Sequence, residues 1–140
     1  MSDELLLPRE IAEQMIEHCL EDRPNEACGL LARDGDRIVR LYRMTNASAS
    51  PLRYSLDPKE QFKVYRDIDD NGWELAGVYH SHTRTEAYPS PTDVRMASED
   101  VPYIIVSLAS EPAAIRSFRI RKALWTDDTG EIDEMPVVVG

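Results

Sequence analysis

Three short apolar runs, each about as long as a β-strand, divide this chain. They cover residues 27–32, 75–79 and 103–108. Two amphipathic helical patterns lie among them, at residues 8–22 and 58–70. Apolar strands that alternate with amphipathic helices must pack the helices on a sheet to bury their apolar faces. The pattern therefore predicts a mixed α and β protein.

Local turn and capping signals set the expected bounds of these elements. Pro8 suits the first turn of the first helix, and Asp57 is expected to be the N-cap of the second helix. The buried stripe of the second helix is expected to contain Phe62, Tyr65 and Ile68.

Further strands complete the expected topology. The turn Asp34-Gly35-Asp36 predicts a hairpin. Additional strands are expected at residues 38–42, 52–56, 115–120 and 132–139. Without an internal repeat or a linker, the sequence predicts one α+β domain over residues 1–140.

The charge of the chain restricts its partners. It has 16 basic and 26 acidic residues, which gives a formal net charge of −10. Nucleic-acid binding normally requires the opposite charge, because phosphate contacts dominate that affinity. An anionic membrane surface is disfavoured for the same reason, and no apolar run approaches the roughly 18 residues that span a bilayer. We therefore expect no nucleic-acid or membrane partner. The acidity is compatible with a basic protein partner, or it only keeps the protein in solution.

The N-terminal sequence and the cysteines bear on location. The sequence MSDELLLPRE has an acidic lead and lacks the basic region of a secretory signal. We therefore expect a cytoplasmic protein. The two cysteines, Cys19 and Cys28, are too few for a disulfide scaffold or a four-thiolate zinc site.

A candidate metal site follows from the end of the apolar run at 75–79. This run continues directly into His80-Ser81-His82. Because side chains alternate along a strand, both imidazoles lie on one face and Ser81 on the other. Asp93 follows after a loop, and two histidines with one carboxylate form a known ligand set for catalytic zinc. The fourth coordination position would be left for water.

Each of these residues also has an ordinary structural interpretation. Most histidine pairs at strand ends are not metal ligands. Ser90-Pro91-Thr92-Asp93 is in addition a good helix start, with Ser90 as N-cap and Asp93 at the third helical position. Capping and metal binding do not exclude each other, because a capped helix would hold Asp93 in place.

The complete string of residues resembles a known signature. Glu26 is followed by His80-Ser81-His82, then by seven residues, Ser90, two residues and Asp93. This resembles the JAMM (MPN+) metalloprotease motif. The surrounding sequence is also similar to that family: residues 26–31 resemble its first strand, and Asn46, Pro51, Tyr54 and Pro58 resemble its middle segment. The resemblance spans the chain from the first helix to about Ile120. It implies a JAMM/MPN fold of cytidine-deaminase-like architecture, a single mixed sheet flanked by helices.

The resemblance implies a role for each residue of the motif. His80, His82 and Asp93 would bind Zn²⁺. Glu26 would act as the catalytic acid and base. Ser90 would stabilise the oxyanion of the tetrahedral intermediate, although a purely capping role stays open. Cys28, two residues beyond Glu26, is either a structural residue beside Gly29 or a further ligand, and the structural role is favoured.

The same resemblance suggests a substrate. The short chain and the residues that follow His82, beginning with Thr83, are most similar to a compact bacterial branch. Its members release a C-terminal cysteine from a ubiquitin-like sulfur-carrier protein during cysteine biosynthesis. The expected reaction is hydrolysis of the peptide bond after the Gly-Gly tail of the carrier.

Several alternatives stay open from the sequence. One is a peptidase that trims or deconjugates other ubiquitin-like proteins. Another is a non-catalytic module that binds a ubiquitin-like protein. A third is a metal-free hydrolase that uses Ser81 or Ser90, which is disfavoured because the chain has no Gly-x-Ser-x-Gly elbow. The sequence does not predict the oligomeric state.

Overall fold

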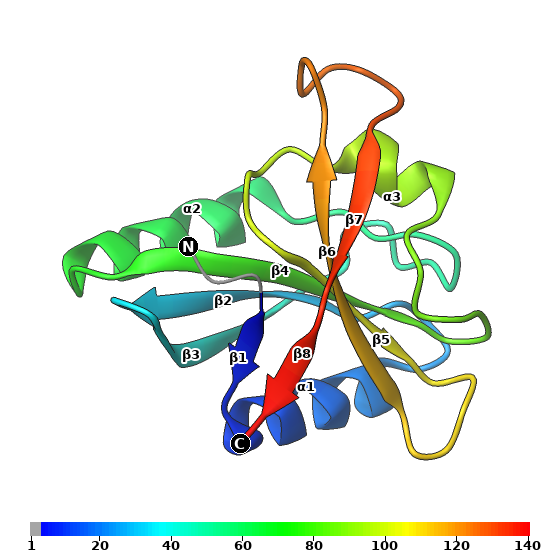
Figure 1. The fold of residues 1–140 in the computed structure, drawn as a ribbon, viewed down its shortest axis with the longest axis horizontal. Helices are drawn as coiled ribbons and strands as arrows, with labels where there is room; N and C mark the ends of the chain where they lie inside the picture. The colour runs from blue at the N-terminus through cyan, green and yellow to red at the C-terminus, as the bar shows by residue number, and fades with distance from the viewer. Residues whose placement is uncertain (1–3) are drawn as a thin grey trace.

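The computed structural model describes residues 4–140, so the first three residues of the acidic N-terminal lead lie outside the described part. The elements follow one another in the order β1 (Leu5–Leu7), α1 (Arg9–Asp22), β2 (Cys28–Asp34), β3 (Arg37–Met44), α2 (Pro58–Asp70), β4 (Glu74–His82), α3 (Pro91–Met96), β5 (Tyr103–Ser107), β6 (Ala114–Arg121), β7 (Glu131–Met135) and β8 (Val137–Val139). Figure 1 shows α1 and α2 on either side of a strongly twisted sheet.

The main sheet has six strands in the order β3-β2-β4-β5-β6-β7. All neighbouring strands are antiparallel except β4 and β5, which are parallel. The predicted mixed α+β fold is therefore confirmed. The sequence did not predict a second, two-stranded sheet, in which β1 runs parallel to β8.

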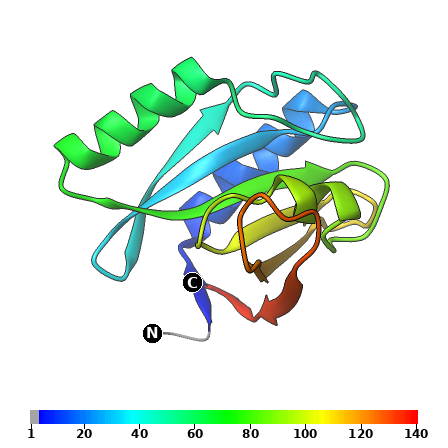
Figure 2. The same cartoon turned by 90° about the horizontal axis from the view of Figure 1, so that it is seen from above.

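The two faces of the main sheet carry different apolar clusters. On one face, Leu31, Tyr79 and Ile104 pack against α1. On the other face, Leu30 and Val78 pack against residues of α2 and α3. This alternation follows from the two-residue period of a strand and places the helices in separate layers (Figure 2). None of the helices within residues 4–140 is long and apolar enough to cross a membrane.

The helices match the predicted capping but not every predicted burial. Asp57 is the N-cap of α2, and its carboxylate accepts a hydrogen bond from the Lys59 backbone. Pro8 is the N-cap of α1 rather than its first helical residue. In α2, Ile68 is buried, but Phe62 is 67% exposed, so its predicted burial is wrong. The reason is tertiary, because α2 contacts the sheet along only part of its apolar face.

Two strand predictions are also wrong. Residues 52–56 form no strand; only an isolated bridge joins Asn46 to Leu56. The tail at 132–139 is two strands rather than one, because Pro136 separates β7 from β8 and the two strands join different sheets. Proline has no backbone N–H to donate to a ladder, which explains the break. The predicted hairpin at Asp34-Gly35-Asp36 is confirmed, with Gly35 at φ 62°.

Candidate active site

The histidine pair lies at the end of β4, as its sequence position predicts. His80 and His82 are both buried, and their side chains share one face of the strand. Ser81 is directed elsewhere: its hydroxyl oxygen accepts a hydrogen bond from the Ala27 backbone at 2.8 Å. This contact places the Ser81 hydroxyl group against the residue that precedes β2 and argues against a nucleophilic serine at this position.

Helix α3 brings Asp93 to the same place. The hydroxyl oxygen of Ser90 accepts a hydrogen bond from the Asp93 backbone at 3.0 Å, and the Asp93 carboxylate accepts one from the Ser90 backbone at 2.9 Å. These reciprocal bonds form a capping box, so the predicted helix start is confirmed. The capping box fixes the carboxylate while leaving it free to face the histidines.

Three potential ligand atoms converge at this point. Asp93 Oδ2 lies 3.0 Å from His82 Nε2 and 3.1 Å from His80 Nε2, and the two Nε2 atoms are 3.1 Å apart. Within residues 4–140 these three side chains are the only such group of histidine, cysteine or acidic residues with ligand atoms within 4.8 Å of one another. The close approach of three electron-rich atoms in a buried place fits one bound cation, and two histidines with a carboxylate suit zinc.

The environment of the histidines sets their protonation. Burial lowers the pKa of His80, which favours the neutral imidazole that binds metal. Burial also opposes charge on His82, but hydrogen bonds to Asp93 and to the Glu86 carbonyl raise its pKa overall. Burial alone would raise the pKa of Asp93, but its hydrogen bonds with the two imidazoles outweigh burial and hold that pKa well below its usual range.

Further contacts orient the two imidazoles. His82 Nδ1 lies 2.8 Å from the carbonyl oxygen of Glu86, so an N–H at Nδ1 would leave Nε2 as the ligand atom. The ring of Tyr54 stacks on His80 with 4.5 Å between ring centroids and 25° between planes. The sequence assigned no role to Tyr54, and no local pattern could have predicted a contact made across the fold.

Glu26 lies just before β2, next to the end of β4 in the antiparallel pair. It is only 4% exposed, and its Oε1 has no hydrogen-bond partner in the described structure. Burial raises the pKa of its carboxyl group to about 8, while the charges of His82 and Asp93 lower and raise that pKa, respectively. A carboxyl group that is buried beside candidate metal ligands and has a free oxygen is well placed to exchange protons.

Cys28 has the structural environment that the sequence favoured. It is fully buried, and its backbone is opposite that of His80 in the register of β2 and β4. Burial raises the pKa of its thiol to about 12, so the thiolate that binds metals is disfavoured. Cys28 is not part of the convergent group found within residues 4–140.

The chain is similar to known proteins in both sequence and structure. Residues 8–121 match a family described as prokaryotic homologs of the JAB domain. A CysO-cysteine peptidase from Mycobacterium tuberculosis is 41% identical over 134 residues, which are 93% of this chain and 92% of that protein. A probable TtuB-protein conjugate cleaving protease from Thermus thermophilus is 36% identical over 72% of this chain and 68% of its own length.

Two solved structures have the same fold. The solution structure of protein DSY2949 from Desulfitobacterium hafniense has a TM-score of 0.82 and 37% identity, covering 96% of this chain and 92% of its own. The crystal structure of AF2198, a JAB1/MPN domain protein from Archaeoglobus fulgidus, has a TM-score of 0.60 and 18% identity, with 98% and 100% covered. At that identity the second likeness supports the fold alone.

Proposed function

Because the chain belongs to the family of prokaryotic homologs of the JAB domain, whose JAMM members are peptidases, we propose that this peptidase depends on zinc and acts on a ubiquitin-like sulfur carrier. It hydrolyses the peptide bond after the Gly-Gly tail of the carrier and releases a C-terminal cysteine. The observation that carries the proposal is the convergence of His80, His82 and Asp93 beside the buried carboxyl group of Glu26, whose Oε1 has no hydrogen-bond partner in the described structure.

His80, His82 and Asp93 hold the metal in this proposal. The chemistry that zinc would supply there is that of a Lewis acid, which would polarise the scissile carbonyl group and make water easier to deprotonate. The protein supplies rigid ligands, because the capping box fixes Asp93 and the Glu86 carbonyl oxygen fixes the ring of His82. Burial of all three side chains excludes bulk water from the ligand atoms.

Glu26 carries the proton in this proposal. Its carboxylate oxygen accepts a proton from the attacking water and then gives that proton to the amine nitrogen as the C–N bond breaks. A carboxyl group whose pKa is raised to about 8 by burial is a stronger base than an exposed glutamate. The same group is therefore suited to both transfers near neutral pH.

Ser90 stabilises the oxyanion in this proposal. Its hydroxyl oxygen accepts a hydrogen bond from the Asp93 backbone, which uses a lone pair and leaves the O–H free to donate. A donor held by the capping box would need little reorganisation when negative charge develops. The capping role and the catalytic role are thus compatible.

The substrate class rests on similarity. A relative that is 41% identical over nearly the whole chain is named a CysO-cysteine peptidase, which favours a carrier with a C-terminal cysteine. The similarity to a probable TtuB-protein conjugate cleaving protease favours an alternative, in which the enzyme removes proteins conjugated to a ubiquitin-like carrier. In both cases the partner is a ubiquitin-like protein, and we place the reaction in the cytoplasm. The complete motif favours catalysis over a module that only binds.

The proposal is tested by incubating the purified protein with a sulfur carrier that bears a C-terminal cysteine and measuring the intact mass of the carrier. We expect loss of one cysteine residue, abolition by a chelator and recovery with zinc. A parallel reaction with a carrier joined through an isopeptide bond separates the two substrates. Activity that persists in the chelated protein would contradict the metal assignment, and an intact cysteine adduct with a cleaved conjugate would favour the alternative.

A further inference from the structure

The segment 46–56, between β3 and α2, is a closed loop. The isolated bridge between Asn46 and Leu56 joins its two ends, and the Ala47 backbone donates to the Ser55 carbonyl oxygen at 2.9 Å. Ser48 and Ser55 also join across the loop through their hydroxyl groups, which lie 2.8 Å apart. Compact loops with adjoining ends and internal packing often carry function.

The side chain of Asn46 fills the inside of this loop. Its amide nitrogen donates to the carbonyl oxygen of Arg53 at 3.0 Å and more weakly to that of Ser50 at 3.4 Å. Its amide oxygen accepts from the backbone N–H groups of Ser48 and Ser55 at 3.0 and 3.1 Å. A carboxamide has two N–H donors and one oxygen with two lone pairs, so the loop takes both lone pairs and one N–H, and the long contact to Ser50 can only share a donor.

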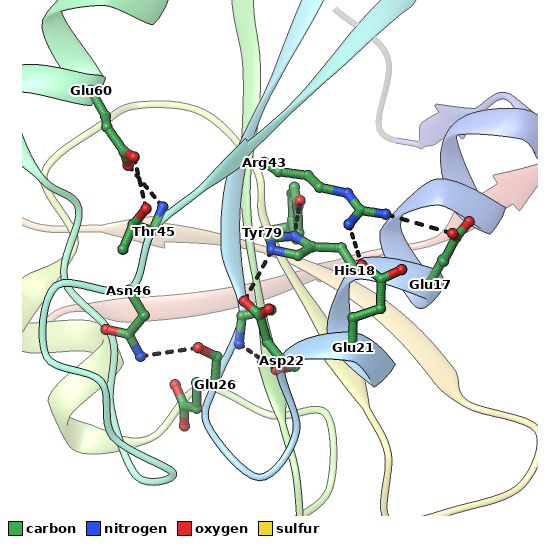
Figure 3. A network of polar contacts seen from close by, with 12 residues as sticks. Glu17, His18, Glu21, Asp22, Glu26, Arg43, Thr45, Asn46, Glu60 and Tyr79 are labelled. Carbon is green, nitrogen blue, oxygen red and sulfur yellow. Dashed lines mark hydrogen bonds and ion pairs between the residues drawn. The ribbon is translucent and has the colours of Figure 1, made fainter.

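The same side chain binds the segment that carries Glu26. Asn46 Nδ2 donates to the backbone carbonyl oxygen of Glu26 at 3.0 Å, and Figure 3 shows this amide directed at Glu26. The Glu26 backbone N–H donates in turn to the carbonyl oxygen of Ser50, at 2.9 Å. The backbone N–H and C=O of Glu26 are therefore both hydrogen-bonded to the closed loop, the first to Ser50 and the second to the side chain of Asn46.

The loop reaches the candidate metal ligands at a second place. Tyr54, which stacks on His80, lies between Arg53 and Ser55. The backbone groups of both neighbours bond to the Asn46 side chain. One buried amide thus fixes the backbone on either side of Tyr54 and the backbone of Glu26.

We propose that Asn46 is a positioning residue of the active site, which holds Glu26 and the ring of Tyr54 in register with the metal ligands. It touches neither the substrate nor the metal, and it acts through the closed loop 46–56. This inference rests on the proposed function, because it gives Glu26 the proton-transfer role. It predicts that loosening the loop impairs turnover more than binding of the carrier.

The test compares Asn46→Asp with a matched control. Aspartate keeps the shape of the side chain but cannot donate to the carbonyl oxygens of Glu26 and Arg53, and it turns a charged oxygen towards them. Asn71→Asp makes the same chemical change at the exposed end of α2, where the Asn71 amide donates to one carbonyl oxygen. Ser48→Ala is a milder second variant, which removes only the hydroxyl contact across the loop.

Two readouts decide the proposal. For Asn46→Asp we expect kcat to fall about 10- to 100-fold, since small misplacements of catalytic groups are costly, while KM and zinc stoichiometry change little. Amide hydrogen exchange should rise at residue 26 and at the non-proline residues of 47–56, and it should stay unchanged in the central strands. Asn71→Asp should behave as wild type. A kcat within about two-fold of wild type, with a loosened loop, would overturn the proposal.

Failure to fold and failure of the proposed function are distinguishable. If Asn46→Asp does not fold, Ser48→Ala decides, because it should loosen the loop and lower kcat, and an unchanged kcat overturns the proposal. If the wild-type protein cleaves no carrier, the proposed function fails. The exchange measurement still applies in that case, because unchanged protection of residue 26 in Asn46→Asp would show that Asn46 does not hold it.

Discussion

At the scale of single residues, the buried carboxyl group of Glu26 destabilises the folded protein at neutral pH. Glu26 is nearly fully buried, its Oε1 has no partner in the described structure, and its carboxyl group has a pKa of about 8. A carboxyl group whose pKa rises on folding binds its proton more tightly in the folded state, so its contribution to stability falls as the pH rises. Its contribution is favourable below the unfolded pKa near 4.5 and is lost as the pH rises through about 8.

Replacing Glu26 with glutamine should therefore separate stability from activity. In chelated protein at pH 7.5, we expect Glu26→Gln to raise Tm by a few degrees, because the glutamate is ionised in the unfolded chain and must take up a proton on folding, whereas the amide need not. At pH 4.5 the difference should shrink, since the carboxyl group of the unfolded wild-type chain is then itself about half protonated. Carrier cleavage should fall by at least about 100-fold in the zinc-loaded variant. Thermal melts at both pH values check the first part, and a lower Tm at pH 7.5 would contradict it.

At the scale of the elements, α3 is a short helix held at both ends. It has six residues, fewer than an isolated helix needs to be stable. The capping box secures its N-terminus. Lys122, which follows β6, donates from Nζ to the carbonyl oxygens of Val94, Arg95 and Ala97 at 3.0, 3.0 and 3.2 Å. A cation at a helix C-terminus also complements the helix dipole.

The contact from Lys122 should support metal binding through α3. Lys122→Met keeps the apolar stem but removes the ammonium group, which should lower the free energy of unfolding by about 1–3 kcal/mol. Zinc affinity should fall several-fold, because Asp93 lies on the loosened helix. Lys63→Met, at an exposed position of α2, is the matched control. Zinc competition titrations measure the effect, and equal affinities in both variants would show that Lys122 does not support Asp93.

At the scale of the whole molecule, the candidate site exists only in the folded chain. Its groups come from the end of β4, from α3 and from the segment before β2, and the main sheet brings them together. A metal that binds this arrangement binds the folded state and not the unfolded state. Metal binding must therefore stabilise the whole fold by linkage.

Zinc should consequently raise the melting temperature of the entire protein. With free zinc at about 100 times its Kd, the expected stabilisation is about 2.7 kcal/mol. Asp93→Asn keeps a capping oxygen but removes the anionic ligand, so it should abolish most of the shift. Differential scanning calorimetry with and without zinc measures this effect. An undiminished shift in the variant would place the metal elsewhere.

The sequence by itself determined the features that depend on near neighbours. The two-residue period of β4 placed His80 and His82 on one face, and the pattern Ser-Pro-x-Asp predicted the capping box of α3. The caps, the first hairpin and the apolar strands followed from equally local rules. The family motif predicted which residues meet, and the structure brings His80, His82 and Asp93 together, while their catalytic roles stay predictions.

Only the tertiary structure decided the features that depend on distant partners. Phe62 has the helical spacing of a buried residue but is exposed on α2 in the folded chain. The strand pattern of the tail could not show that the chain breaks at Pro136 or that β8 then pairs with β1. Asn46 and Tyr54 gave no local sign of their contacts with Glu26 and His80. Side-chain periodicity sets which face a residue occupies, but which segments meet on that face is fixed by packing across the whole chain.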